Sequence, residues 1–298
     1  MRYLFLTIII WGFAYNFSSN VAAVVDNDFV VLSRAFFGAL IFLPFVKIVG
    51  LRKEFIAGLM CIGALQFSIQ LSLYYRAFQY ISVAEVLLFL AILPIYITII
   101  DDLVKRVIKP ISVLSAIIAT VATIAIRWSE ISNDFFIGMV LVQLMCLTFS
   151  MGVVWYKYHN INYNSDNIPD HKLFFYVMLG GVVSSSIMFL LFGNFEELPT
   201  TPGHYGMLAY LGIVVTGICY ALLNKGAKMV SGATTGIFHN LSIPVGMLIT
   251  FLFFDPGSID PITATITLII MGIALYINEV YNDRFVINLS KKLASVDS

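Results

Sequence analysis

Charged residues are scarce in this chain. Aspartate, glutamate, lysine and arginine make up only 11% of its 298 residues, whereas hydrophobic residues make up 60% and the mean hydropathy is +0.93. Soluble domains carry about 25% charged residues, so this chain has too few charges to cover a water-facing surface. Lipid must surround most of the folded protein, and the scarcity of charge therefore predicts an integral membrane protein.

Several signatures of other protein classes are missing. Lysine plus arginine equals aspartate plus glutamate at 17 each, so no net positive charge attracts nucleic acid. Three cysteines, Cys61, Cys146 and Cys219, all lie inside apolar runs and are typical of buried hydrophobic residues. The catalytic motifs H-E-x-x-H and G-x-S-x-G are absent. We therefore predict no enzyme, no metal site and no cofactor.

What the chain has in abundance is long apolar runs. A helix needs about 20 mostly apolar residues to cross the hydrocarbon core of a bilayer. The chain offers ten such runs, and the first follows Arg2 without a small-residue cleavage site, so we expect it to be retained. We predict ten transmembrane helices, at residues 3–22, 29–49, 56–76, 80–100, 111–127, 135–156, 172–192, 204–224, 230–254 and 262–281. The longest connection, 157–171, is expected to be a flexible loop.

The positions of the basic residues predict how the chain is oriented. With the N-terminus inside, fourteen of the 17 lysines and arginines fall in connections on the inner side. This asymmetry is the usual mark of cytoplasmic loops. We therefore expect both termini in the cytoplasm and, for a bacterial protein, a location in the inner (plasma) membrane.

One pattern of polar residues occurs twice, at an offset of 150. A residue every fourth position falls on one face of a helix. The two polar stripes are Gln66, Gln70 and Tyr74, and Thr216, Tyr220 and Asn224. Pro94 recurs as Pro244 at the same offset. Five spans per half place the second half in the opposite orientation, so we predict two inverted five-helix repeats, residues 1–130 and 131–298, around a central cavity.

A series of short motifs runs along nearly the whole chain: Trp11-Gly12, Arg34 with Ala35, Gly38 and Ala39, Tyr75-Arg76-Ala77-Phe78, Ser82, Ala84-Glu85 and Pro94. In this order they resemble the drug/metabolite transporter superfamily in its EamA-like branch. The resemblance implies ten helices around a central cavity, and similar family members include exporters of amino acids and of other small metabolites. It also implies that spans five and ten are peripheral, where a homodimer contact would form.

Polar residues inside the predicted spans are the candidates for substrate binding. The two stripes supply amides, which donate and accept hydrogen bonds, and phenols. The alternative is that these groups only hold helices together. Asn16 in the first span, and His239 with Asn240 near the middle of the ninth, are further candidates. A histidine there relays protons, binds ligand, or is a hydrogen-bonded packing residue.

A second set of residues is expected in gating or coupling. Arg34 either binds a substrate carboxylate or extends to the interface. Glu85 either forms an ion pair with Arg76 or Arg34, or takes up a proton for coupling, or binds a substrate amine. Pro94 and Pro244 each free a backbone carbonyl, and the resulting kink is either a hinge or static.

The sequence favours a secondary-active transporter that works by alternating access and is coupled, in one hypothesis, to protons. Arginine, glutamate, amides and aromatic residues together favour an amino acid or similar zwitterion as the substrate. The alternatives are a nucleotide-derived cofactor such as S-adenosylmethionine, or a cationic drug. A passive channel or a membrane scaffold is the alternative class.

Overall fold

The computed structural model describes residues 1–22, 24–48, 50–127, 135–164, 167–253 and 261–294, with the side chains of 15–16, 19–20, 22, 83–84, 125–127 and 282–294 outside the description. In this part every regular element is helical. The elements are α1 (Arg2–Ala22), α2 (Asn27–Phe42), η1 (Leu43–Phe45), α3 (Lys53–Gly63), η2 (Ala64–Ile69), α4 (Gln70–Ala77), α5 (Val83–Leu90), α6 (Leu93–Lys105), α7 (Pro110–Arg127), α8 (Phe135–Tyr163), α9 (Asp170–Phe192), α10 (Pro202–Tyr210), η3 (Leu211–Ile218), α11 (Cys219–Ala227), α12 (Gly232–Phe253) and α13 (Pro261–Ala294).

These elements join into ten helical segments, because η1, η2 and η3 continue their neighbours and α5–α6 follow each other with a short break. Eight segments are long and apolar enough to cross a membrane. The other two, α1 and α7, contribute shorter described apolar stretches, Arg2–Ala14 and Pro110–Ile124. The connection expected between the spans 56–76 and 80–100 is a turn at residues 78–80, between α4 and α5.

Several predicted boundaries are wrong, and the largest shifts are at the C-terminal ends of two helices. The span expected at 262–281 continues as α13 to Ala294. The span expected at 135–156 continues as α8 to Tyr163, so the first part of the expected loop 157–171 is helical. Lys157, His159 and Asn160 are buried there instead of lying in a loop. The His159 ring stacks on Phe55, with ring centroids 5.0 Å apart. The polar residues end the apolar run but do not end the helix.

Helices from the two halves of the chain interleave. Helix α1 packs against α12, and α8 correspondingly packs against α5 and α6. Helix α2 packs against η3, while α9 packs against α3 and η2. Each contact is thus made twice. When a helix packs against a neighbour, the helix about 150 residues away packs against the counterpart of that neighbour. The core therefore lies between the halves and not within either one.

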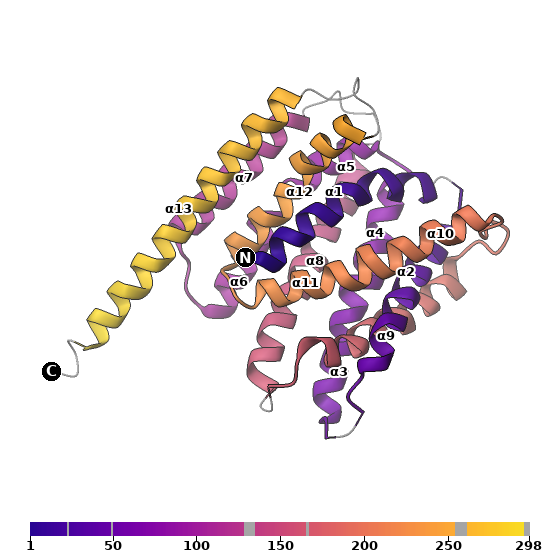
Figure 1. Ribbon diagram of the computed structural model, residues 1–298, viewed down its shortest axis with the longest axis horizontal. Coiled ribbons are helices and arrows are strands. Elements are labelled where there is room, and N and C mark those ends of the chain that lie inside the picture. The colour runs from indigo at the N-terminus through magenta and orange to yellow at the C-terminus, as the bar shows by residue number, and fades with distance from the viewer. Residues whose placement is uncertain (23, 49, 128–134, 165–166, 254–260, 295–298) are drawn as a thin grey trace.

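Helices α7 and α13 form a separate flank of the bundle. They contact each other and α12, and Figure 1 shows α13 running alongside α7 at the edge of the molecule and extending beyond it. Large apolar side chains on α13, such as Ile262, Ile269 and Tyr276, are exposed, which fits a helix facing lipid. The fifth and tenth segments are thus peripheral in the described structure.

Helix α5 ends just before Pro94, near the middle of its segment. Proline lacks a backbone N–H and cannot complete the helical ladder, so carbonyls in the preceding turn lose partners. Side chains of the other half replace them: Asn240 Nδ2 donates to the Ala91 carbonyl at 2.6 Å, and Gln143 Nε2 donates to the Phe89 carbonyl at 3.3 Å. Pro244, in contrast, lies inside the continuous helix α12. The two prolines therefore differ in effect despite their matching positions.

The third and eighth segments each contain a π-helical stretch in corresponding positions. Segment η2 carries Gln66, and η3 carries Thr216, the first residue of each predicted polar stripe. A π-helical turn inserts an extra residue into the ladder and commonly occurs at functional sites. The four-residue spacing of the stripes did not indicate these turns.

Helices α3 and α9 approach so closely that only glycine fits between them. A Cβ atom at Gly63 would collide with the Val177 carbonyl oxygen, and one at Gly180 would collide with the Met60 carbonyl oxygen. Both obstacles are backbone atoms, which cannot rotate away. Small residues permit such close packing of membrane helices.

Replacing Gly63 with alanine should therefore destabilise the fold by about 1–3 kcal/mol through overpacking. The matched control is Gly206→Ala in α10, where nothing lies within 4 Å of the added Cβ. That change should stabilise by about 0.5–1 kcal/mol, because alanine is the better helix former. Unfolding midpoints in a denaturing-detergent titration measure both. Equal midpoints for the two variants would contradict the close approach.

Candidate substrate-binding site

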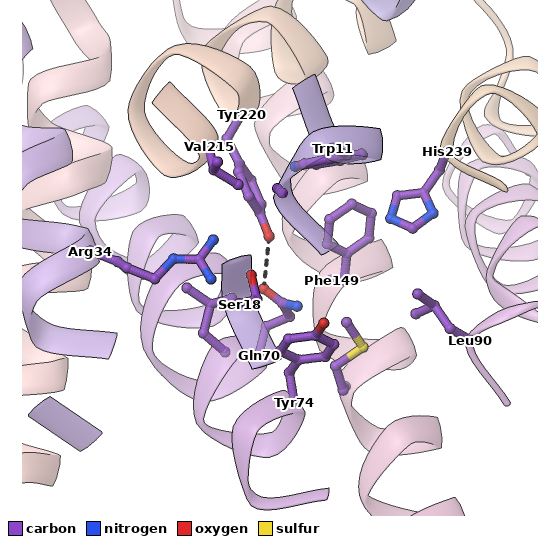
Figure 2. Close-up of a pocket in the computed structure, with 13 residues that line it drawn as sticks. Trp11, Ser18, Arg34, Gln70, Tyr74, Leu90, Phe149, Val215, Tyr220 and His239 are labelled. Carbon is purple, nitrogen blue, oxygen red and sulfur yellow. Dashed lines mark hydrogen bonds between the residues drawn. The ribbon is translucent and has the colours of Figure 1, made fainter. Parts of the chain in front are cut away.

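A pocket lies between the two halves, where the polar stripes meet. Its cavity volume is about 60 Å³, and about 480 Å³ when all the space open to solvent is included. The described residues that line it are Trp11, Ala14, Ser18, Arg34, Gln70, Leu71, Tyr74, Leu90, Met145, Phe149, Val215, Tyr220 and His239. Figure 2 shows Arg34 and His239 on opposite sides, with Tyr220, Gln70, Trp11 and Phe149 between them.

Hydrogen bonds link the two stripes along the pocket. Tyr220 OH donates to Gln70 Oε1 at 3.1 Å, drawn as the dashed line in Figure 2. One turn away, Asn224 Nδ2 donates to Gln66 Oε1 at 3.0 Å and Gln66 Nε2 donates to Asn224 Oδ1 at 3.3 Å. Both of these amides are fully buried. The amide pair therefore holds the two stripes together next to the pocket, without lining it.

Arg34 is deeply buried, with 3% of its surface exposed. Its Nε donates to Thr216 Oγ1 at 2.8 Å and its Nη1 donates to Tyr75 OH at 2.8 Å. Its guanidinium carbon also lies 5.8 Å from the centre of the Tyr75 ring. The alternative that Arg34 extends to the interface is therefore wrong. Within the described part of the chain, its recorded hydrogen-bond partners are hydroxyls, and it forms no ion pair.

Aromatic rings form the wall between Arg34 and His239. The Trp11 ring lies 5.6 Å from Tyr220 and 4.8 Å from His239, and Phe149 lies 5.0 Å from His239, between ring centroids. Trp11 and Phe149 were not among the predicted site residues. Trp11 was noted only as part of a family motif. In an apolar helix, the sequence does not distinguish an aromatic ring that lines a pocket from one that packs in the protein core.

The other predicted binding residues have different places. Thr216, Gln66 and Asn224 are buried and hydrogen-bonded behind the described lining of the pocket. Asn240 is fully buried and donates to Ala91, so it repairs the break before Pro94. Asn16 lies in α1, but its side chain is outside the description. The structure thus brings together Gln70, Tyr74, Tyr220, His239 and Arg34 in one pocket.

In the described part of the chain, Glu85 does not form the expected ion pair with Arg76 or Arg34. The Glu85 carboxylate accepts hydrogen bonds from the Ser82 backbone N–H at 2.7 Å and hydroxyl at 2.8 Å, which caps the start of α5. Arg76 instead pairs with Asp28, at 2.7 Å from Nη2 to Oδ2. A carboxylate three residues into a helix is well placed to accept from the free N–H groups at its start. For Glu85, Ser82 is therefore a nearer partner than either arginine.

A buried charge cluster joins the halves at the ends of α6 and α8. Asp101, only 1% exposed, accepts from Lys157 Nζ at 3.0 Å, Tyr158 OH at 2.9 Å and Lys105 Nζ at 2.6 Å. It also accepts from the Gly232 backbone N–H at 2.9 Å, at the start of α12. Lys157 further donates to the Val230 carbonyl at 2.8 Å. We call these residues the Asp101 cluster.

A second ion pair joins the start of α9 to the end of α11. Lys228 Nζ is 2.5 Å from Asp170 Oδ1 and 3.1 Å from Asn160 Oδ1. Tyr156 OH donates to the same Asp170 oxygen at 2.7 Å. The spans expected from the sequence leave both Lys157 and Lys228 in the connections between helices. Neither cluster was predicted, because its members lie far apart in the chain.

A bundle of apolar helices from two interleaved halves, with a polar pocket between them, is the form of a membrane transport protein. The sequence profile of the EamA-like transporter family matches residues 1–128 and 136–278. This chain therefore belongs to the EamA-like transporter family, is an integral membrane protein and is not an enzyme. The resemblance noted in the sequence is confirmed.

Named relatives within the family are similar over most of their length. The biotin transporter of Escherichia coli strain K12 is 34% identical over 274 residues, which cover 91% of each chain. The probable biotin transporter of Pseudomonas aeruginosa is 34% identical over 256 residues, covering 86% of this chain and 89% of that one. The biotin transporter of Salmonella typhimurium is 35% identical over 251 residues, covering 84% and 83%.

A solved crystal structure shares the fold. It is 14% identical in sequence, superposes with a TM-score of 0.75, and the match covers 93% of this chain and 95% of the other. At this identity the likeness shows the fold alone. None of the three relatives is described as an amino-acid transporter, so the expected amino-acid substrate finds no support among them.

Proposed function

We propose that this protein is a secondary-active transporter of a small carboxylate with a polar ring body, and that its substrate is biotin. The observation that carries the proposal is Arg34. A buried cation is costly unless an opposite charge accompanies it, and the recorded partners of this guanidinium are hydroxyls. A substrate carboxylate entering the pocket supplies the missing charge and two strong hydrogen-bond acceptors.

The lining of the pocket favours a monocarboxylate over a zwitterion. An amino acid carries an ammonium group that needs an anionic partner. Arg34 is the only charged residue in the described lining, and Glu85 is engaged in capping α5. Biotin has a single carboxylate, which matches the one cation of the pocket. Its apolar chain matches the aromatic wall, and its cyclic urea matches the amide and phenol groups. The names of the relatives independently support this choice.

We propose that transport uses the two inverted repeats, 1–130 and 131–298, in ten transmembrane helices. The reciprocal packing of α1 on α12 and α8 on α5–α6 supports this, as does the match of the family profile to 1–128 and 136–278. The proposed boundary at residue 130 lies outside the described residues. Both termini would be cytoplasmic, and a bacterial inner membrane fits the relatives.

The hydrogen bonds between the stripes support an alternating-access cycle. With an offset of 150, the Gln70–Tyr220 contact is its own counterpart. The Gln66–Asn224 pair corresponds to a contact between Thr216 and Tyr74, yet Thr216 binds Arg34 and Tyr74 faces the pocket. In our proposal the opposite-facing state separates Gln66 from Asn224 and joins Tyr74 to Thr216. Thr216 then no longer accepts a hydrogen bond from Arg34. The change of state thus alters the contacts of the residue that binds the carboxylate.

We propose the proton as the coupling ion, since a carboxylate that moves together with a proton carries no net charge across the membrane. Pro94, beside the break between α5 and α6, is the proposed hinge, with Pro244 as its partner in α12. Arg76 and Glu85 would hold the ends of α4 and α5 in place, through Asp28 and Ser82 respectively.

Counterflow into proteoliposomes tests the function without assuming a direction. Vesicles that contain the purified protein are loaded with unlabelled biotin and diluted into labelled biotin at a trace concentration. We expect transient accumulation of label, which excess unlabelled biotin abolishes and excess leucine or biotin methyl ester does not. Accumulation no greater than in protein-free vesicles would contradict the proposal. Equal competition by leucine would restore the zwitterion hypothesis.

A further inference from the structure

His239 has an unusual environment for a packing residue. It is 5% exposed, it lines the pocket, and its ring lies between Trp11 and Phe149 at centroid distances of 4.8 and 5.0 Å. Its Nδ1 atom is buried and, within the described part of the chain, has no hydrogen-bond partner. Figure 2 shows the ring pointing toward Phe149, across the pocket from Arg34.

A buried ring nitrogen without a hydrogen-bond partner in the described residues needs an explanation. Buried polar atoms are nearly always hydrogen-bonded, since an unpaired one keeps the full penalty of its desolvation. Phenylalanine would fill the same space between two aromatic rings without that penalty. The ring is best treated as neutral, because an imidazolium would place a second cation in a cavity that already holds Arg34. A neutral imidazole offers one donor and one acceptor.

We propose that His239 selects the substrate by hydrogen bonding to its cyclic urea, at the end of the molecule opposite the carboxylate. A cyclic urea presents both N–H groups and a carbonyl oxygen, so it satisfies Nδ1 in either tautomer. The Trp11 and Phe149 rings then pack against the ring body, and Arg34 takes the carboxylate. This inference rests on the proposed function and adds that the pocket recognises two separated groups, a carboxylate and a cyclic urea.

The two ends are tested separately with matched ligands. Desthiobiotin keeps the cyclic urea and the carboxylate, lipoate keeps a carboxylate without a urea, and biotin methyl ester keeps the urea without the charge. Competition with labelled biotin gives the affinity of each for the full-length protein in detergent. The variants are His239→Phe, which keeps a ring of similar size, and His239→Asn, which restores a polar atom close to the Nδ1 position.

We expect the wild-type protein to bind desthiobiotin at least about 10-fold more tightly than lipoate, since a site built for a hydrogen bond rejects an analogue that lacks it. His239→Phe should reduce this preference to near unity, through an affinity loss for desthiobiotin of about 10- to 100-fold. Its preference for biotin over the methyl ester should persist. His239→Asn should restore part of the preference for the urea.

The possible failures are distinct. If the wild-type protein binds neither biotin nor desthiobiotin, the proposed function is wrong and this inference falls with it. If it binds biotin but His239→Phe keeps the full preference for desthiobiotin over lipoate, only the inference is overturned. An equal loss of affinity for all ligands would also overturn it, because it indicates a structural role. Should His239→Phe not fold, His239→Leu provides the same comparison.

Discussion

Replacing Arg34 with methionine should weaken biotin binding by about 100- to 1,000-fold and abolish counterflow. Truncating one partner of a buried, hydrogen-bonded charge pair typically costs 2–5 kcal/mol of binding free energy, and each factor of ten corresponds to about 1.4 kcal/mol. The structure makes this large loss plausible because Arg34 is the only charged residue in the described lining. Isothermal titration and counterflow with the variant measure the two effects.

The same substitution should leave the ligand-free protein as stable as the wild type, or more stable. Arg34 has no ion-pair partner in the described residues, so its removal ends the cost of burying a charge. Arg76→Met is the matched control. It would leave the 4% exposed Asp28 carboxylate without its cation and should lower the unfolding midpoint. A large stability loss in Arg34→Met would show that the arginine is structural.

Arg34→Lys separates charge from geometry. Lysine keeps the positive charge but loses the planar group with several donors, so we expect binding between those of the wild-type and methionine variants. The methyl ester provides the second control. It lacks the anion, so its weak affinity should be similar in all three proteins. An ester affinity that falls together with biotin affinity would instead indicate a collapsed pocket.

The position of the site could be predicted from the sequence because two periodic signals coincide there. The four-residue spacing places Gln66, Gln70 and Tyr74 on one helix face, and the offset of 150 indicates their counterparts. The structure brings Gln70 against Tyr220 and Gln66 against Asn224. The sequence could not show that Gln66 and Asn224 would hydrogen-bond to each other outside the pocket lining, since that depends on how far one helix is shifted along the other.

The ends of the helices were harder to predict. Hydropathy treats Lys157 as the start of a loop, because a lone lysine is expensive inside a membrane protein. Helix α8 nevertheless continues through Lys157, since Asp101 from the other half neutralises it. The same reasoning explains Asn240, which looked like a ligand-binding amide and in fact serves the carbonyl of Ala91. Both errors arise because a single sequence does not reveal partners distant in the chain.

The Asp101 cluster should be the most sensitive structural feature outside the pocket. Asp101→Asn keeps the size of the side chain but removes the negative charge. Lys157, which is only 6% exposed, then has no compensating anion in the described cluster. Breaking a buried ion pair from one side typically costs about 3–5 kcal/mol. We expect a loss of that size in the free energy of unfolding, measured by denaturing-detergent titration.

The neighbouring residue provides a matched control for this prediction. Asp102 is also buried, at 4% exposure, but its carboxylate accepts from the Lys109 backbone N–H at 2.9 Å, a bond that an asparagine oxygen can also accept. Asp102→Asn should therefore cost less than about 1 kcal/mol. The double variant Asp101→Leu with Lys157→Met removes both charges and should recover much of the loss caused by Asp101→Asn. If the double variant is less stable than Asp101→Asn, the stabilisation comes from hydrogen bonds to Tyr158 and Gly232 and not from the pairing of charge between the halves.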